Sequence, residues 1–140
     1  MLRDVRDTFT RFIADNVADA EIPVHQLRRD PLDPATMTLS SNAINIQFLS
    51  LSVSFVESKQ DVVLSIVNDS ELVALGWTDL VVEILISSYM TSLKDYTDTE
   101  APVLLGSNIY WDRERVVFRP IYTDGYFQYN CNLALRFRHT

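Results

Sequence analysis

A long run of strict alternation near the C-terminus constrains the fold more than any other feature of this sequence. From Tyr126 to Phe137, apolar and mostly polar side chains take turns at every position. The apolar set is Phe127, Tyr129, Cys131, Leu133, Leu135 and Phe137. A period of two sustained over this length is typical of a β-strand whose two faces differ in environment. The sequence therefore predicts a long C-terminal strand with its apolar face against a core.

Two helices and several further strands are predicted in the rest of the chain. Apolar residues recur at three- and four-residue steps over 2–17, and a second helix is expected from the capping pattern of Asn68 and Glu71 to about Leu93. Strand patterns cover 22–27, 43–55, 61–67, 103–111, 115–122 and 126–137. We therefore expect an α+β fold, a mostly antiparallel β-sheet with two main helices packed on one face, in the order α-β-β-β-α-β-β-β.

Two irregularities interrupt this regular order. The apolar parity changes between Phe48 and Leu49, so we expect a bulge or bend that keeps both halves of this strand facing the core. Two prolines between about 30 and 42 exclude regular helix or a central strand and predict a long loop. No repeat or change of composition divides the 140 residues, so a single domain is expected.

The second helical segment is apolar on more than one side. Its apolar residues between Leu72 and Leu93 wrap well beyond the stripe of about 100° that covers one sheet. In a monomer the excess would be exposed, so we expect a second protein surface to cover it. The alternative, in which the first helix covers the far side within one subunit, stays open.

Charge and scarce residue types exclude several classes of function. The chain has 12 Lys and Arg against 19 Asp and Glu, a formal net charge of −7, and its basic residues are scattered, which disfavours a nucleic-acid groove. Three widely separated glycines exclude a P-loop and a dinucleotide fingerprint. No apolar run approaches the length of a membrane span, and no signal peptide is recognised, so a reducing cytoplasm is the default compartment.

Candidate catalytic and metal-ligating side chains are few. His25 falls in a strand pattern, where we expect it to be exposed, and His139 is the penultimate residue. The single Cys131 lies on the apolar side of the last strand and is interpreted as a core residue. One cysteine and two histidines cannot form a Cys/His metal site, and the acidic stretch 95–100 lacks the pattern of a calcium loop. We therefore expect no enzyme activity, no metal and no cofactor.

Three segments carry a family likeness that covers most of the chain. They are His25-Gln26-Leu27-Arg28-Arg29-Asp30-Pro31-Leu32-Asp33-Pro34-Ala35-Thr36, Asn42-Ala43-Ile44-Asn45-Ile46-Gln47-Phe48-Leu49 and Tyr126-Phe127-Gln128-Tyr129-Asn130. Together with the order of elements and the length, they resemble the tail terminator, or tail-completion, proteins of tailed bacteriophages. The resemblance implies a non-enzymatic virion protein that forms a hexameric ring, caps the tail tube, ends its polymerisation and joins it to the head-side connector.

The resemblance also implies partners, a location and interface residues. The partners would be further copies of the chain, the tail tube protein and the head-side connector or stopper protein, in the tail or neck of a virion assembled in the host cytoplasm. DNA would pass through the lumen without specific binding, which an acidic chain suits. The second helix, a sheet edge and the long loop acting as an arm would form the interfaces. The interface residues predicted on this basis are Arg28, Arg29, Asp30, Leu32, Asp33, Leu75, Val82, Tyr89, Tyr110, Trp111 and Arg119.

Other functions stay open from the residues alone. A neighbouring neck protein, such as a head–tail connector or stopper, would share much of this pattern. A small-ligand or peptide-binding α+β module is also possible, because six tyrosines and two tryptophans could line a pocket for a basic ligand. A hydrolase would need His25 beside a nucleophile and a carboxylate.

Overall fold

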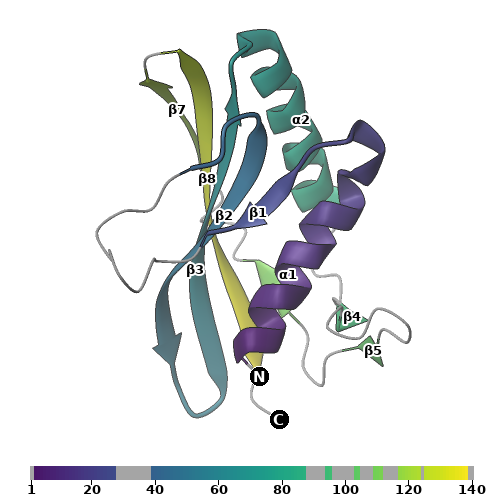
Figure 1. Cartoon of the computed structure of the whole chain (residues 1–140). Helices are drawn as coiled ribbons and strands as arrows, with labels where there is room; N and C mark the ends of the chain where they lie inside the picture. The colour runs from purple at the N-terminus through teal and green to yellow at the C-terminus, as the bar shows by residue number, and fades with distance from the viewer. Residues whose placement is uncertain are drawn as a thin grey trace, which may run out of the picture.

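The alternating C-terminal segment forms strand β8 (Tyr126–Arg138), which pairs with three other strands of the main sheet. The structure, a computed structural model, describes residues 2–27, 39–87, 94–95, 103–104, 109–111, 117–123 and 125–138. The other elements are α1 (Leu2–Asn16), the 3-10 helix η1 (Ala18–Ala20), β1 (Val24–Gln26), β2 (Ala43–Val53), β3 (Glu57–Asn68), α2 (Glu71–Ser87), β4 (Lys94–Asp95), β5 (Val103–Leu104), β6 (Ile109–Trp111) and β7 (Val117–Thr123). The predicted α+β fold is confirmed (Figure 1).

The main sheet has the strand order β1-β2-β3-β8-β6, and β7 also pairs with β8. Only the pairing of β1 with β2 is parallel among these described strands. Because β3 follows one edge of β8 throughout, β6 and β7 share its other edge, one after the other. Pro120 in β7 is compatible with this outer position, because an edge strand can leave one backbone group without a ladder partner.

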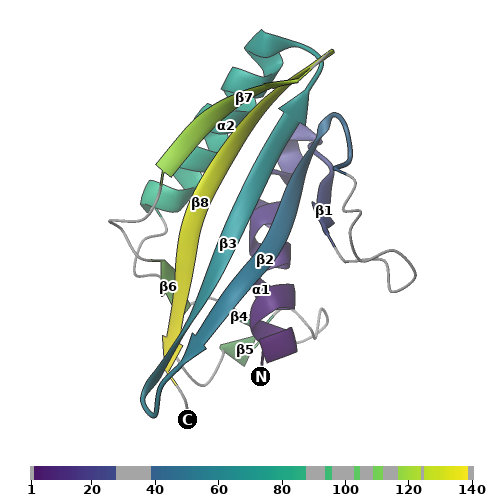
Figure 2. The ribbon, with the colours of Figure 1, turned by 90° about the vertical axis from the view of Figure 1, so that its left-hand side faces the viewer.

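Both helices cover the same face of the sheet, as predicted. Figure 2 shows α1 and α2 behind β2, β3 and β8, with no described helix in front of them. The alternation of the strands places one row of side chains toward the helices, such as Ile46, Leu64 and Cys131, which stand opposite one another and are fully buried. The hydrophobic core lies between this face and the two helices.

Helix α1 packs on the sheet through the apolar stripe that its sequence predicts. Its buried apolar residues, with Val17 just beyond its end, are Val5, Phe9, Phe12, Ile13 and Val17. Phe9 meets Phe48 of β2 edge to face, with ring centroids 6.4 Å apart. The guanidinium of Arg6 lies 5.3 Å from the centroid of the same Phe48 ring. The first helix therefore contacts β2 through Phe48, and it also lies against β1.

The predicted irregularity in β2 is a β-bulge. Phe48 stands opposite Val62 and Leu51 opposite Gln60, so β2 has one more residue than β3 in this interval. Leu51 returns to the core, as expected, but Val53 and Phe55 are exposed. The expectation that both halves face the core was wrong for these two residues, because the β2–β3 hairpin projects past the ends of the helices (Figures 1 and 2). It was also wrong for Leu49, which lies within the bulge and is 45% exposed.

Several element boundaries differ from the predicted ones. The polar segment 57–60 falls between the predicted strands 43–55 and 61–67, but it belongs to β3. Its buried residues Ser58 and Gln60 lie on the core side. Helix α2 is capped by Ser70 and not by Asn68, because Asn68 still pairs in the β3 ladder and accepts a hydrogen bond from the Ser70 amide (2.9 Å). The predicted strand 103–111 is two strands, since β5 pairs with β4 and β6 with β8.

Two predicted features fall partly outside the described residues. Of the proline-containing loop, only its last residues are described, and there Ser40 is tied to Asn45 of β2 by two hydrogen bonds of 2.9 Å. The expected continuation of α2 from Ser87 to Leu93 also lies outside the described residues. No helix within the described ranges is long and apolar enough to cross a membrane.

Candidate functional site

An apolar stripe runs along the outer side of α2. One side of the helix faces the core through Ala74, Thr78, Val81, Ile84 and Leu85. Leu72, Leu75 and Ile86 are 82%, 39% and 73% exposed, and Val82, which lies between them along the helix, is partly buried. We call Leu72, Leu75, Val82 and Ile86 the α2 stripe. With Asp79 included, its members recur at alternating steps of three and four residues, the spacing of a helix–helix seam.

The α2 stripe is not covered by α1. The apolar residues of α1 are buried against the sheet, and the three most exposed residues of the stripe keep their exposure in the folded subunit. The prediction of excess apolar surface on this helix is therefore confirmed. The alternative, that α1 covers it within one subunit, was wrong, because α1 lies against β1 and contacts Phe48 of β2, and its apolar residues are buried in the core there.

The charged side chains of α2 itself are all negative. Glu71, Asp79 and Glu83 are exposed, and α2 contains no lysine, arginine or histidine between Glu71 and Ser87. The carboxylates interrupt and flank the apolar side chains. A partner for this surface should therefore combine apolar side chains with positive charge.

A second apolar surface lies at the turn between β2 and β3. Phe55 is fully exposed, and Val53 and Val56 are each 65% exposed. We call these three residues the hairpin tip. Ser54 holds the turn, because its hydroxyl donates to the carbonyl oxygen of Glu57 (2.7 Å) and accepts from the Glu57 amide (3.1 Å), while the two backbones also bond (3.0 Å). The hairpin tip is thus a hydrogen-bonded turn whose apolar side chains are exposed.

Two cations stand beside the hairpin tip on the face of the sheet without helices. Lys59 of β3 and Arg136 of β8 are direct cross-strand neighbours, on the opposite face from buried Gln60. Like charges in such a pair repel, and Glu57 offsets part of this repulsion through an ion pair with Arg136 (3.6 Å). Positive charge therefore lies next to the hairpin tip along the strands, on the opposite face of the sheet from Val53, which pairs with buried Ser58.

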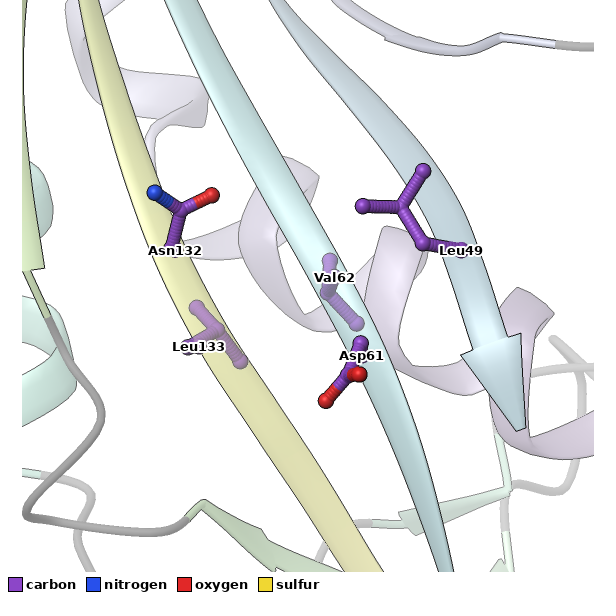
Figure 3. Close-up of a pocket in the computed structure, with 5 residues that line it drawn as sticks. All are labelled: Leu49, Asp61, Val62, Asn132 and Leu133. Carbon is purple, nitrogen blue, oxygen red and sulfur yellow. The ribbon is translucent and has the colours of Figure 1, made fainter. Parts of the chain in front are cut away.

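A shallow depression occupies the same face of the sheet, nearer its middle. It has a volume of about 230 Å³ and is lined by Leu49, Asp61, Val62, Asn132 and Leu133 (Figure 3). None of these is aromatic, so this depression does not match the pocket lined by tyrosine and tryptophan that a ligand-binding module would use. Within the described ranges, no group of three or more His, Cys, Asp and Glu side chains is placed to hold a metal.

Of the three residues considered for catalysis, His139 lies outside the described residues, and the other two lie apart. Cys131 is fully buried in the core row of β8, as predicted, and burial raises the pKa of its thiol to about 12. His25 is exposed in β1, also as predicted, opposite Asn45 of β2. Cys131 is therefore a core residue, and β1 places His25 at the edge of the sheet, separated from β8 by β2 and β3.

We expect the Cys131 thiol to be protected in the folded protein. At pH 8 its reaction with an aromatic disulfide reagent should be roughly a thousandfold slower than in urea, because the thiolate fraction falls about tenfold for each unit by which the pKa rises. Absorbance of the released thiolate measures both rates. Labelling at similar rates with and without urea would contradict the buried position.

No protein-family model and no curated protein matches this sequence.

The structure brings together only part of the predicted interface set. Leu75 and Val82 lie on the α2 stripe as expected. Tyr110 and Trp111 in β6 and Arg119 in β7 belong to the outer edge of β8, but their side chains are outside the described part. The others, also outside the described residues, are Arg28, Arg29, Asp30, Leu32, Asp33 and Tyr89.

Sequence reasoning missed the hairpin tip because it assigned Val53 and Phe55 to the core. A signal was present, since serines at 50, 52 and 54 occupy alternate positions along the last part of β2 up to the turn. Serines at this density are more typical of an exposed hairpin end than of a buried strand.

Proposed function

We propose that this protein is a non-enzymatic assembly protein of the tail-terminator type. Its subunits form a closed ring of six copies that caps a phage tail tube, ends tube polymerisation and joins the tube to the head-side connector. The ring acts in the tail or neck of a virion that is assembled in the host cytoplasm. The observation that carries this proposal is the exposed α2 stripe, and the sequence likeness to tail terminators supplies the specific role.

The α2 stripe supports an assembly role because such a surface is costly to leave in water. Leu72 and Ile86 are among the most exposed large apolar side chains of the described chain. Scattered apolar side chains are ordinary on a monomer, but several in one row along a helix are typical of an interface. A helix that is buried on one side and apolar on another is therefore suited to a subunit that is completed by its neighbours.

Two separate apolar surfaces also suit a ring in particular. A closed ring uses heterologous contacts, in which one surface of a subunit meets a different surface of the next. The α2 stripe and the hairpin tip are different surfaces on different elements. The net charge of −7 further suits a ring through which DNA passes without being held.

The first test is the mass of the purified protein by light scattering after size exclusion, over a range of concentrations. We expect a species of about 97 kDa, six times the 16.1 kDa of one chain. Electron microscopy of tail tube protein assembled with and without this protein should then show capped tubes of limited length. A 16.1 kDa species at every concentration, together with uncapped tubes, would contradict the proposal. A ring that binds the head-side connector but leaves tubes uncapped would identify a neck connector instead.

A further inference from the structure

We infer that the hairpin tip of one copy docks on the α2 stripe of the next copy in the ring. This inference rests on the proposed function, because it assigns the subunit contact of that ring. The occupant of the α2 stripe is thus a second copy of this chain, and the contact is heterologous.

The two surfaces match in kind. The hairpin tip offers one fully exposed aromatic ring, Phe55, between two exposed valines. The α2 stripe offers four aliphatic side chains, and with the exposed Asp79 among them the positions recur at alternating steps of three and four residues, which leave recesses between successive turns of the helix. Buried aromatic anchors carry a large share of binding energy at protein interfaces. Phe55 is the anchor in this contact, and Leu75 and Val82 border its site, with Asp79 between them at the side.

The two surfaces cannot meet within one subunit. Strand β3 runs from the hairpin tip directly to the start of α2, and its 12 residues span about 40 Å at the usual rise of a strand. Figures 1 and 2 show the turn at one end of the sheet and the beginning of α2 at the other. Apolar contact between them therefore requires two copies, joined head to tail, which is the arrangement that closes into a ring.

Charge favours the same pairing. Lys59 and Arg136 follow the hairpin tip on β3 and β8, on the opposite face of the sheet from Val53, whereas Asp79 interrupts the α2 stripe and Glu71 and Glu83 flank it. Bringing the two surfaces together places cations near carboxylates, and it also relieves the repulsion between the two neighbouring cations. Two α2 stripes facing each other would instead bring six carboxylates together without a compensating cation on either helix.

The turn that carries Phe55 is ordered in the single subunit. The three hydrogen bonds between Ser54 and Glu57 hold the turn in one conformation before any contact forms. A surface that is already ordered loses less conformational entropy on binding. An exposed phenylalanine on such a turn is therefore prepared for docking.

Cysteine cross-linking tests the contact directly. Phe55→Cys protein and Leu75→Cys protein are mixed in equal amounts and treated with a short thiol-to-thiol cross-linker, while the native Cys131 is buried and does not compete. We expect cross-linked dimers in the mixture and not with either variant alone. A chain that carries both substitutions should give a ladder that ends at the number of subunits in the ring.

Val73→Cys provides the matched control. Val73 is 40% exposed, as much as the 39% of Leu75, but two residues along a helix turn it to the opposite side of α2. We expect Phe55→Cys mixed with Val73→Cys to give few dimers. Equal cross-linking to Val73 and Leu75 would overturn the inference, and so would dimers of Phe55→Cys alone, which would mean that two hairpin tips meet.

A charge exchange tests the electrostatic part of the contact. Lys59→Glu and Glu83→Lys should each raise the concentration at which half of the protein is assembled, by about tenfold, and the double variant should assemble close to the original concentration. Asp15→Lys, on the exposed side of α1, changes the net charge by as much as Glu83→Lys does, but away from both surfaces, and should have little effect. Failure of the double variant to recover would overturn the pairing.

The outcomes separate this inference from the proposed function. A ring of the expected mass that caps tubes, without the Phe55–Leu75 cross-link, would overturn the inferred contact and leave the proposed function standing. A cross-linked ring that does not cap tubes would support the inferred contact and overturn the proposed function.

Discussion

Replacement of Phe9 by alanine is expected to lower the free energy of unfolding by about 3–5 kcal/mol. Phe9 is fully buried in α1 and meets Phe48 of β2 edge to face. Alanine would leave a cavity at the contact that attaches the first helix to the sheet. Since a domain of this size has a total stability of about 5–15 kcal/mol, this one change removes a large share of it. Urea unfolding followed by circular dichroism measures the difference.

Two further variants make the Phe9 result interpretable. Phe9→Leu removes less volume and should cost clearly less than Phe9→Ala. Arg11→Ala changes an exposed residue of the same helix and should shift the free energy of unfolding by less than about 0.5 kcal/mol. A loss below about 1 kcal/mol for Phe9→Ala would contradict the packing of α1 described above.

Replacement of Gln60 by leucine is expected to cost about 2–4 kcal/mol, although leucine has a similar size and is apolar. The buried amide of Gln60 holds the β2 bulge, because its Nε2 donates to the carbonyl oxygens of Leu49 (3.1 Å) and Ser50 (3.2 Å). Its Oε1 accepts a hydrogen bond from the Arg6 guanidinium (3.1 Å). With leucine at position 60, the two carbonyl oxygens and the charged Arg6 guanidinium would each lose the hydrogen bond to the Gln60 amide.

The same urea measurement, with amide hydrogen exchange of β2, checks the Gln60 prediction. We expect faster exchange around the bulge in Gln60→Leu, and little change in the far part of β3 near Ile66. Ser52→Ala, at an exposed position of β2 close by, serves as the control and should be nearly neutral. Stability equal to that of the original protein would mean that the bulge does not depend on this side chain.

The elements that could be predicted are those specified by a local period. Three- and four-residue steps identified α1, and strict alternation identified β8, because each pattern reports which side of one element is buried. The parallel pairing of β1 with β2, and the shared edge that β6 and β7 form along β8, depend on contacts between distant segments. No local pattern in the sequence contains that information.

The candidate site could be predicted on the helix but not on the hairpin. Leu75 and Val82 were identified because α2 has more apolar positions than one buried side requires. Phe55 was missed because alternation indicates only that apolar side chains share a face. Whether that face is covered depends on how far the helices reach, and they end before the turn.

The bulge in β2 also bears on how this protein behaves at high concentration. Among the described residues, β1 pairs with β2 only from Ile44 to Ile46, so the rest of this strand lies at the border of the sheet. A regular border strand is a template on which further chains can stack into fibrils. The extra residue at Leu49 and Ser50 breaks the repeat that a stacking chain needs. The same irregularity that shapes β2 thus guards the protein against aggregation.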